Sequence, residues 1–338
     1  MAEKVRIGFI GAGRMAHVHA GHLRLDRDVE IVAASDHGSG RAHDFTRDYG
    51  AVAWSDYRRM LDQSALDAVY ICTPTATHAA IAMQCVERGL HLFLEKPLDL
   101  DLGAAARLTN AVVAGKLVAL TAFQWRYSPG YLRAQEFIGD EAVALVVLRW
   151  YWTRPPIRWM WDRTQAGGQI VDQSIHLIDV SQGLAGDIST VYAAYNARQV
   201  NFEPEFNNWD GYALTLKYTN GAVGTCSGTY ALFPEIQKRP TADFCLRDRL
   251  VRLTDNEVTL YTPSGTQSWQ NNEPLHRGVN RAFITAVRDR RPDEVRTPLS
   301  IGLRSTAVAL AANRSAESGH VININDFLRE HTWDETGP

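Results

Sequence analysis

Residues 5–16 constrain the fold more than any other segment, because a short apolar run leads into a glycine-rich turn that opens a helix. The turn has the form GxGxxA, with Gly11, Gly13 and Ala16 at the spaced positions. In this pattern the first glycine permits a tight turn and the second lets a pyrophosphate approach the backbone. The third small residue lets the helix pack on the strand. The pyrophosphate then lies at the helix N-terminus, so the segment predicts a dinucleotide-binding Rossmann domain.

An acidic residue follows the second apolar run of the chain. Asp36 lies 23 residues after Gly13, just beyond the predicted strand 30–34. A carboxylate at this place accepts hydrogen bonds from the 2′-hydroxyl of the ribose and repels a 2′-phosphate. His37 and Arg41 lie nearby and supply some positive charge that suits NADP. On balance the sequence predicts NAD as the cofactor, with NADP less favoured.

Segment 1–121 alternates between strand-like and helix-like runs. Because this alternation builds a parallel sheet covered by helices on both faces, its strands are continuously apolar. We therefore expect an α/β fold in which residues 1–122 form a doubly wound parallel sheet, the Rossmann domain. Strands are predicted at 5–10, 30–34, 67–72, 91–94 and 117–121, and helices at 14–25, 77–88 and 101–114.

The pattern changes after residue 122. A long strand is predicted at 144–153 and a helical run at 169–182. The dipeptide Asn220-Gly221 is a strong hairpin signal between strands 212–218 and 222–230. Residues 123–338 are therefore predicted to form a second α/β domain with a large, mostly antiparallel open sheet. A helix near 298–317 is expected to pack back on the Rossmann domain.

Composition excludes several classes of partner. The chain has 338 residues, a net charge of -3 and 22% charged residues, so neither nucleic acid nor a membrane surface is an expected partner. No apolar run has the length of a membrane span.

The four cysteines form no CxxC pair, which favours reduced thiols in a cytoplasmic protein. His17, His19 and His22 do not converge on one helical face, so they are expected to flank the turn or face solvent, and no metal is predicted.

Two segments carry side chains suited to proton transfer. Lys96 follows the predicted strand 91–94, at the sheet edge where a nicotinamide would lie; a surface lysine in a loop is the alternative. Asp172 and His176 are four residues apart in the predicted helical run, which places them on one helix face. An imidazole moves protons near neutral pH, and either Asp172 or Asp179 would orient it. A buried histidine with a purely structural role is the alternative.

Four of the nine tryptophans fall between residues 150 and 161. Trp150 and Trp152 share one face of the predicted strand, because side chains alternate along a strand, and they are predicted to lie in a subunit interface or the core. Trp159 and Trp161 precede the helical run. They are candidates for lining a sugar pocket, with an indole against the apolar face of a ring; packing within the loop is the alternative.

Taken together, these motifs resemble the Gfo/Idh/MocA oxidoreductase family, to which glucose–fructose oxidoreductase and inositol dehydrogenase belong. The likeness covers most of the chain and follows the order of the family's motifs. Ala16 stands in place of a third glycine, and Gln169 in place of a small or apolar residue. The matching motifs are the turn at 11–16, Thr73-Pro74-Thr75 with His78, Glu95-Lys96-Pro97, the segment 125–129, and the segment from Gly167 to His176.

The resemblance implies hydride transfer between NAD and a secondary alcohol of a sugar, inositol or related polyol. It implies a catalytic set of Lys96, Asp172 and His176, and a Lys96–Pro97 peptide bond in the cis form. The residues expected to bind the cofactor are Gly11, Ala12, Gly13, Arg14, Met15, Asp36, Thr73, Pro74, Thr75, His78, Glu95, Lys96, Gln124, Trp125 and Arg126. Those expected to bind the substrate are Lys96, Arg126, Trp159, Trp161, Asp172 and His176.

The resemblance also implies how the reaction proceeds. His176 would accept the hydroxyl proton as the hydride leaves, while Lys96 would hydrogen-bond the same oxygen and Asp172 would fix a neighbouring hydroxyl or the imidazole. The open sheet face would build a homodimer or homotetramer. Two other functions fit the same scaffold: a glycosidase that uses NAD transiently, and a non-catalytic sensor of nucleotide and sugar.

Overall fold

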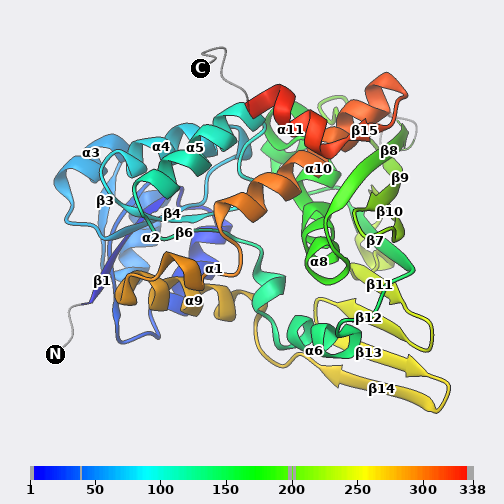
Figure 1. The fold of residues 1–338 in the computed structure, drawn as a ribbon. Coiled ribbons are helices and arrows are strands. Elements are labelled where there is room, and N and C mark those ends of the chain that lie inside the picture. The colour runs from blue at the N-terminus through cyan, green and yellow to red at the C-terminus, as the bar shows by residue number, and fades with distance from the viewer. Residues whose placement is uncertain (1–3, 39, 197–199, 201–202, 333–338) are drawn as a thin grey trace. The chain divides into compact units, whose positions relative to one another are not determined.

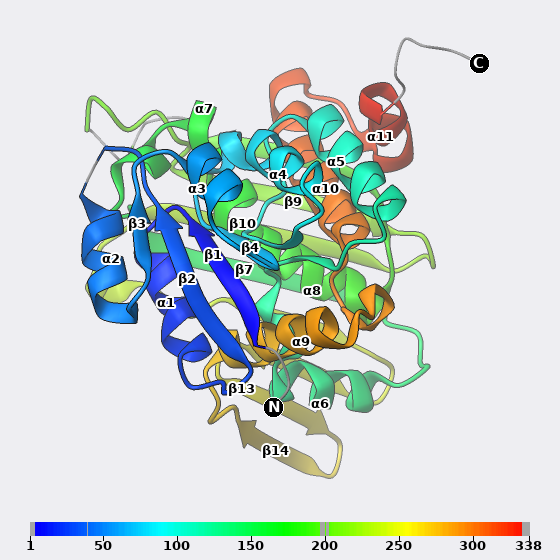
Figure 2. The same ribbon diagram turned by 90° about the vertical axis from the view of Figure 1, so that its left-hand side faces the viewer.

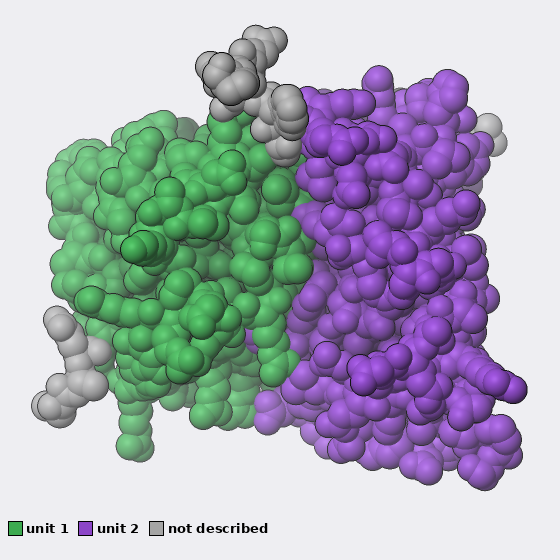
Figure 3. Space-filling view, viewed as in Figure 1, with its two compact units in different colours: residues 1–124, 274–303 green, residues 125–273, 304–338 purple. Residues whose placement is uncertain are grey.

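The chain forms two compact units. The structure is a computed structural model that describes residues 4–38, 40–196, 200 and 203–332. Unit 1 contains residues 1–124 and 274–303, and unit 2 contains residues 125–273 and 304–338 (Figure 3). This division differs from the predicted boundary between residues 122 and 123, because residues 274–303 belong to unit 1.

A six-stranded sheet is the framework of unit 1. Its strands lie in the order β3-β2-β1-β4-β5-β6, and all neighbouring pairs are parallel (Figures 1 and 2). The strand order reverses between β1 and β4, as it does in doubly wound dinucleotide-binding sheets. The predicted Rossmann sheet is therefore confirmed. The strands are β1 Val5–Ile10, β2 Val29–Ser35, β3 Val52–Trp54, β4 Ala68–Ile71, β5 His91–Leu94 and β6 Ala119–Thr121.

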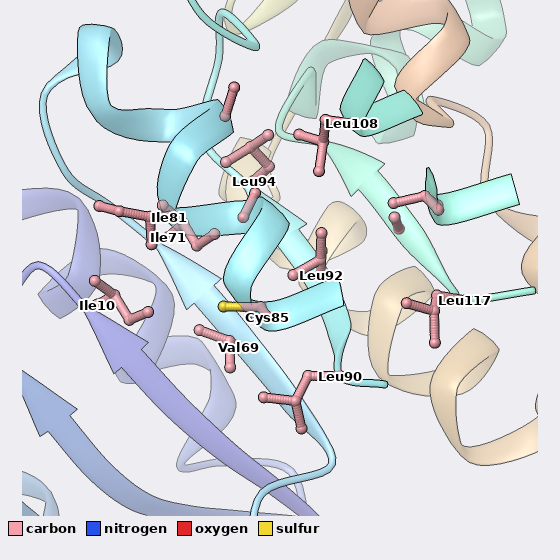
Figure 4. Packing of buried hydrophobic residues seen from close by; sticks show 14 of the residues in the cluster. Ile10, Val69, Ile71, Ile81, Cys85, Leu90, Leu92, Leu94, Leu108 and Leu117 are labelled. Carbon is pink, nitrogen blue, oxygen red and sulfur yellow. The ribbon is translucent and has the colours of Figure 1, made fainter. Parts of the chain in front are cut away.

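One face of this sheet packs against three helices that follow its strands. Ile71 and Leu94 from the sheet meet Ile81 from α4 and Leu108 from α5 in an aliphatic core (Figure 4). Because this face and the opposite face of the sheet are both covered, the strands carry buried apolar residues at consecutive positions. The helices of unit 1 are α1 Arg14–Leu23, α2 Arg41–Tyr49, α3 Tyr57–Gln63, α4 His78–Val86, α5 Leu102–Ala114, α9 Leu275–Asp289 and the start of α10 Leu299–Ser318, with short 3-10 turns at Thr75–Thr77 and Pro292–Glu294.

Aromatic side chains line the opposite face of the sheet. Tyr70 of β4 stacks on Phe9 of β1 and Phe93 of β5, with ring centroids 5.0 and 4.2 Å apart. Phe283 of α9 packs edge-on against Tyr70 and Phe93, and His19 of α1 also lies against both rings. Helix α9 thus joins this layer although it lies far away in the sequence. Its apolar stripe does not reveal from sequence alone which sheet it will cover.

Unit 2 is built on a nine-stranded sheet in the order β14-β13-β12-β11-β7-β10-β9-β8-β15. Among the strand pairs of the described residues, only β7 and β10 are parallel, so the predicted large, mostly antiparallel sheet is confirmed. The turn at Asn220-Gly221 joins β9 to β10, and Gly221 adopts a φ of +93°, as the hairpin signal predicts. The strands are β7 Leu145–Thr153, β8 Ile188–Asn196, β9 Gly211–Tyr218, β10 Val223–Leu232, β11 Thr241–Cys245, β12 Leu250–Thr254, β13 Glu257–Thr262, β14 Gly265–Gln270 and β15 Ile322–Asn323.

The two faces of this sheet differ in their cover. Val146 and Leu148 of β7 are fully buried, and helix α8 packs against this strand. On the other face, Ala213, Thr215 and Lys217 of β9 are exposed. The helical segments of unit 2 are α6 Pro129–Ile138, α7 Arg163–Ala166, α8 Ile175–Ala185, α11 Ile324–Thr332, the remainder of α10, a π-helix at Ile170–Ser174, and 3-10 turns at Gln124–Tyr127, Arg158–Trp161 and Pro234–Ile236.

Candidate active site and cofactor-binding residues

The glycine turn between β1 and α1 has the geometry that a dinucleotide site needs. Gly11 has a φ of +87°, and a Cβ there would lie 2.5 Å from the carbonyl oxygen of Cys72. Apart from Gly13 itself and its two chain neighbours, no heavy atom of the described residues lies within 4 Å of the place that a Cβ of Gly13 would take. Gly13 is also the N-cap of α1, whose first residues are Arg14 and Met15. The open space beside Gly13 and the exposed helix N-terminus therefore fit a pyrophosphate.

Asp36 lies immediately beside this turn. It follows β2, and its Oδ2 accepts a hydrogen bond of 3.0 Å from the backbone N–H of Ala12. The carboxylate is thus held at the carboxyl end of the sheet, next to the turn. That place fits the ribose contact predicted from the sequence.

His78 connects the loops that follow β4 and β5. Its Nδ1 lies 2.8 Å from the carbonyl oxygen of Pro97, and its Nε2 lies 2.9 Å from that of Thr73. The side chain is buried, and Thr75 beside it is buried as well. Both ring nitrogens of His78 therefore lie at hydrogen-bond distance from backbone carbonyl oxygens. The predicted contact of His78 with the cofactor stays a prediction.

The tip of β5 presents Glu95 and Lys96. The strand ends at Leu94, and the Lys96–Pro97 peptide bond is cis, in agreement with the family resemblance. Glu95 is buried, whereas Lys96 is half-buried. Oε2 of Glu95 accepts a hydrogen bond of 3.3 Å from the backbone N–H of Lys96. The carboxylate thus contacts the backbone of the residue that the sequence proposes as catalytic.

His19 corrects one prediction made from the sequence. It does not flank the turn or face solvent, because it is fully buried. Its Nε2 lies 2.8 Å from Oε1 of Glu95, and its ring packs against the aromatic rings of Tyr70 in β4 and Phe93 in β5. Helical periodicity alone gives no sign of this contact, because Glu95 comes from a distant strand.

Glu95→Gln is expected to change the acid dependence of stability. Burial raises the pKa of Glu95, but the hydrogen bond and charge of His19, with Lys96 and His276, lower it by more, to about 2. Since the ordinary value is 4.5, the carboxylate stabilises the folded state above pH 4.5. About 3 kcal/mol of this stabilisation is lost as the pH falls from there to about 2.

Urea unfolding across this acid range measures the effect. As the pH falls from 4.5 to about 2, the free energy of unfolding of the wild-type protein should decrease by about 3 kcal/mol through Glu95. The E95Q variant should lack this contribution to the decrease. Glu30→Gln removes the same charge from an exposed position on β2 and should keep the wild-type slope. Equal slopes for wild-type and E95Q would contradict the assignment.

Within the described ranges, no group of three or more histidine, cysteine, aspartate or glutamate side chains could hold a metal ion. In those same ranges, no helix combines the length and apolar character that crossing a membrane requires.

In unit 2, Arg126 forms a buried ion pair. Its Nε donates to Oδ2 of Asp179 at 2.8 Å, and its Nη2 donates to the Asp179 carbonyl oxygen at 2.9 Å. Asp179 is fully buried. The carboxylate that the sequence offers as an alternative partner for His176 is thus engaged by Arg126. The neighbouring Trp125 is buried at 2% exposure, and the predicted ligand contacts of Gln124, Trp125 and Arg126 stay predictions.

Asp172 and His176 do not share one α-helix. Residues Ile170–Ser174 form a π-helix, and α8 begins only at Ile175. Asp172 therefore lies in the π-helix and His176 in the first turn of α8, and the sharing of one face by their side chains stays a prediction. Both residues are 5% exposed. Oδ2 of Asp172 accepts a hydrogen bond of 3.1 Å from the hydroxyl of Tyr230, a residue that the sequence analysis missed.

Trp150 lies beside His176, with ring centroids 6.1 Å apart and planes 30° apart. Trp152 packs against a buried cluster formed by Trp161, Phe206 and Tyr230. The two tryptophans therefore lie on the helix-covered face of the sheet, which favours the core over a subunit interface, the two places predicted for them. Their alternation along β7 is predictable, but the face they take depends on where α8 packs.

Gln169 anchors the start of the π-helix to the sheet. Its Nε2 lies 3.3 Å from the carbonyl oxygen of Trp150, 3.0 Å from that of Thr229 and 3.1 Å from Oε1 of Gln173. Gln169 is buried at 3% exposure. Gln169, which stands where the family commonly has a small or apolar residue, thus links β7 and β10 to the segment that carries Asp172 by hydrogen bonds.

Trp161 is enclosed by its own loop. Its indole N–H donates to the carbonyl oxygen of Pro155 at 2.7 Å, and the guanidinium groups of Arg154 and Arg158 lie 4.5 and 4.1 Å from its ring centroid. These contacts favour the alternative that Trp161 packs the loop. Trp159 is half-buried in the same 3-10 turn. On β7, the hydroxyl of Tyr151 lies 3.1 Å from that of Ser227.

Comparisons with known proteins agree with this arrangement. Residues 5–123 match the family described as "Oxidoreductase family, NAD-binding Rossmann fold", and residues 131–240 match the GFO/IDH/MocA C-terminal domain. Inositol 2-dehydrogenase of Rhizobium meliloti is 30% identical over 95% of this chain and 99% of its own length. scyllo-Inositol 2-dehydrogenase (NAD(+)) of Bacillus subtilis is 28% identical over 66% of this chain and 67% of its own.

Solved structures share the fold. GenD2 from gentamicin A biosynthesis, in complex with NAD, has a TM-score of 0.83 at 24% identity and covers 96% of this chain and 97% of its own. Levoglucosan dehydrogenase in complex with NADH has a TM-score of 0.83 at 19% identity over 95% and 99%. With the full-length relative and the two family matches, these findings show that the chain belongs to the Gfo/Idh/MocA family of oxidoreductases, whose N-terminal domain is an NAD-binding Rossmann fold.

Proposed function

We propose that this protein is an NAD-dependent dehydrogenase that oxidises a secondary alcohol of an inositol, a sugar or a related polyol. The observation that carries the proposal is the pair Asp172 and His176, two buried groups for proton transfer at the junction of the π-helix and α8. The chain also keeps a dinucleotide turn and Lys96 at the tip of β5. Relatives named inositol 2-dehydrogenase support this class of substrate.

The chain's own residues would handle the proton and the substrate oxygen. Bound NAD⁺ supplies the acceptor for the hydride that leaves the alcohol carbon. His176 accepts the hydroxyl proton, and Lys96 donates a hydrogen bond to the same oxygen and stabilises its developing charge. Asp172, held by Tyr230, accepts a hydrogen bond from a neighbouring hydroxyl or orients the imidazole. A polyol offers such a second hydroxyl next to the reacting one.

The site geometry supports a proposal for the cofactor contacts. Residues 11–15 would receive the pyrophosphate, Asp36 the adenosine ribose, and residues 73–75 and Glu95 the nicotinamide half. Asp36 favours NAD over NADP, because its carboxylate would repel a 2′-phosphate. Unit 1 would thus hold the cofactor and unit 2 the substrate.

For the substrate we propose Trp150 in place of Trp161. Trp150 stacks beside His176, and its indole nitrogen is buried with no hydrogen-bond partner among the residues that the structure describes. An indole N–H in this state costs free energy unless a ligand accepts from it. Trp161 already donates to Pro155.

We further propose that the protein is a cytoplasmic homo-oligomer. The open face of the nine-stranded sheet carries the exposed side chains of Ala213, Thr215 and Lys217, and a second copy of the chain would cover it. All four cysteines are free thiols, as in proteins of a reducing compartment.

A panel of inositols, sugars and sugar acids with NAD⁺ and NADP⁺ tests the proposed function. Reduced cofactor should accumulate with NAD⁺ and at least one polyol, and much less with NADP⁺. Cleavage of a glycoside without net reduction of the cofactor would support the glycosidase function instead. Binding of NAD⁺ without turnover on any compound would support a sensor.

A further inference from the structure

Three buried side chains form a chain of contacts that ends at the tip of β5. Nδ2 of Asn280 in α9 lies 3.0 Å from Nδ1 of His19 in α1, and Nε2 of His19 lies 2.8 Å from Oε1 of Glu95. His19 is fully buried and Asn280 is 2% exposed. All three residues belong to unit 1, although they come from segments far apart in the sequence.

Neighbouring aromatic rings fix the orientation of the His19 imidazole. Its ring lies 4.6 Å from that of Phe93, 5.6 Å from that of Tyr70 and 5.5 Å from that of His276, measured between centroids. Asn280 is fixed in turn, because its Nδ2 also donates to the carbonyl oxygen of His276 at 2.6 Å. Hydrogen bonds in such a buried setting are stronger than exposed ones. The carboxylate of Glu95 is therefore held from behind by a rigid support.

The held carboxylate lies on the nicotinamide half of the sheet. The turn after β1 and Asp36 after β2 belong to the half that takes the adenosine in this fold, and β4 to β6 form the other half. Glu95 stands at the carboxyl end of β5, where ligands of such sheets bind. Oε1 faces His19. Oε2 receives a long bond from the backbone N–H of Lys96, and a carboxylate oxygen with one such bond retains capacity to accept from a hydroxyl.

We propose that His19 is a positioning residue for the cofactor. With Asn280 behind it, His19 holds the Glu95 carboxylate in the place where it accepts a hydrogen bond from the ribose next to the nicotinamide. The inference rests on the proposed function, because it requires NAD(H) as the ligand. An acceptor that is already ordered costs less conformational entropy on binding, so this support raises the affinity for the cofactor.

Two amide substitutions of His19 separate this role from simple packing. The amide nitrogen of glutamine, a donor, reaches about as far as Nε2 of histidine, and the amide oxygen of asparagine, an acceptor, reaches about as far as Nδ1. His19→Gln therefore keeps the contact with Glu95, and His19→Asn keeps only the contact with Asn280. We expect the dissociation constant for NAD⁺, measured by calorimetry, to rise about 10-fold in H19N and less than about 3-fold in H19Q. At saturating NAD⁺, KM for the polyol should stay unchanged in both.

His22→Asn in the same helix is the matched control, since no hydrogen bond or ion pair between His22 and Glu95 is found in the described residues. Its affinity for NAD⁺ should equal that of wild-type protein. Equal losses in H19Q and H19N, or no loss in either, would overturn the positioning role while leaving the proposed function intact. Absence of NAD⁺ binding by wild-type protein would instead remove the proposed function itself.

Asn280→Leu tests the same chain from its other end and decides the question if H19N does not fold. Leucine has nearly the shape of asparagine, so α9 keeps its packing while the support of His19 is lost. The dissociation constant for NAD⁺ should rise about 3-fold, less than in H19N, because Glu95 keeps its direct partner. Wild-type affinity in N280L would contradict the proposal.

Discussion

Replacing His176 by alanine is expected to lower kcat by about 10²–10⁴-fold, the usual contribution of a positioned general base. His176 is buried beside Trp150, so water has little access to take over the proton. The dissociation constant for NAD⁺ should change little, because the proposed cofactor residues belong to other segments. Steady-state rates with the best polyol of the panel, together with calorimetry for NAD⁺, measure both quantities.

His320→Ala is the matched control for this prediction. His320 is an exposed histidine of the same unit, and its loss should leave kcat within about 2-fold of wild-type, as expected for a surface substitution. Near-wild-type turnover of H176A would show that another group takes the proton. A collapse of NAD⁺ affinity in H176A would show a structural effect instead.

Arg126→Ala is expected to destabilise the fold by about 3–5 kcal/mol, a large part of the free energy that holds a domain together. Asp179 is fully buried, and its carboxylate faces the guanidinium of Arg126 at 2.8 Å. Burial raises the pKa of Asp179, and Arg126 offsets part of this rise. Without the arginine, a buried charge is left without its cation. Urea unfolding without ligand measures the loss.

A double variant tests whether the uncompensated charge is the cause. In R126M/D179L both ionic groups are replaced by apolar side chains of similar size, which is often close to neutral for stability. The double variant should therefore be more stable than Arg126→Ala alone. A double variant that is less stable than the single one would show that packing, and not the isolated carboxylate, causes the loss.

Sequence patterns were sufficient for the parts of the fold that depend on local periodicity. The apolar runs at 5–10 and 91–94 are β1 and β5 with the same limits, and the Asn-Gly turn joins β9 to β10. The glycine turn and Asp36 lie side by side, as the motif requires. Such features depend on backbone conformation and on alternation along one segment, so a single sequence contains them.

Other features depend on contacts between distant segments and were not predictable in this way. His19 meets Glu95, and Tyr230 meets Asp172, only because the sheet brings them together. The π-helix at Ile170–Ser174 has no compositional sign, so the spacing of Asp172 and His176 suggested an α-helix. For Trp150 both an interface and the core stayed open, because alternation does not tell which face of a sheet a helix covers.

The central claim is that a hydride passes from a polyol carbon to NAD⁺ and stays there. The most direct measurement uses the best polyol of the panel with deuterium at the oxidised carbon, and mass spectrometry of the cofactor and the sugar product. If the hydride passes to NAD⁺ and stays there, the reduced cofactor should contain one deuterium for each molecule of ketone formed. Deuterium that returns to a cleaved sugar, with the cofactor left oxidised, would contradict it.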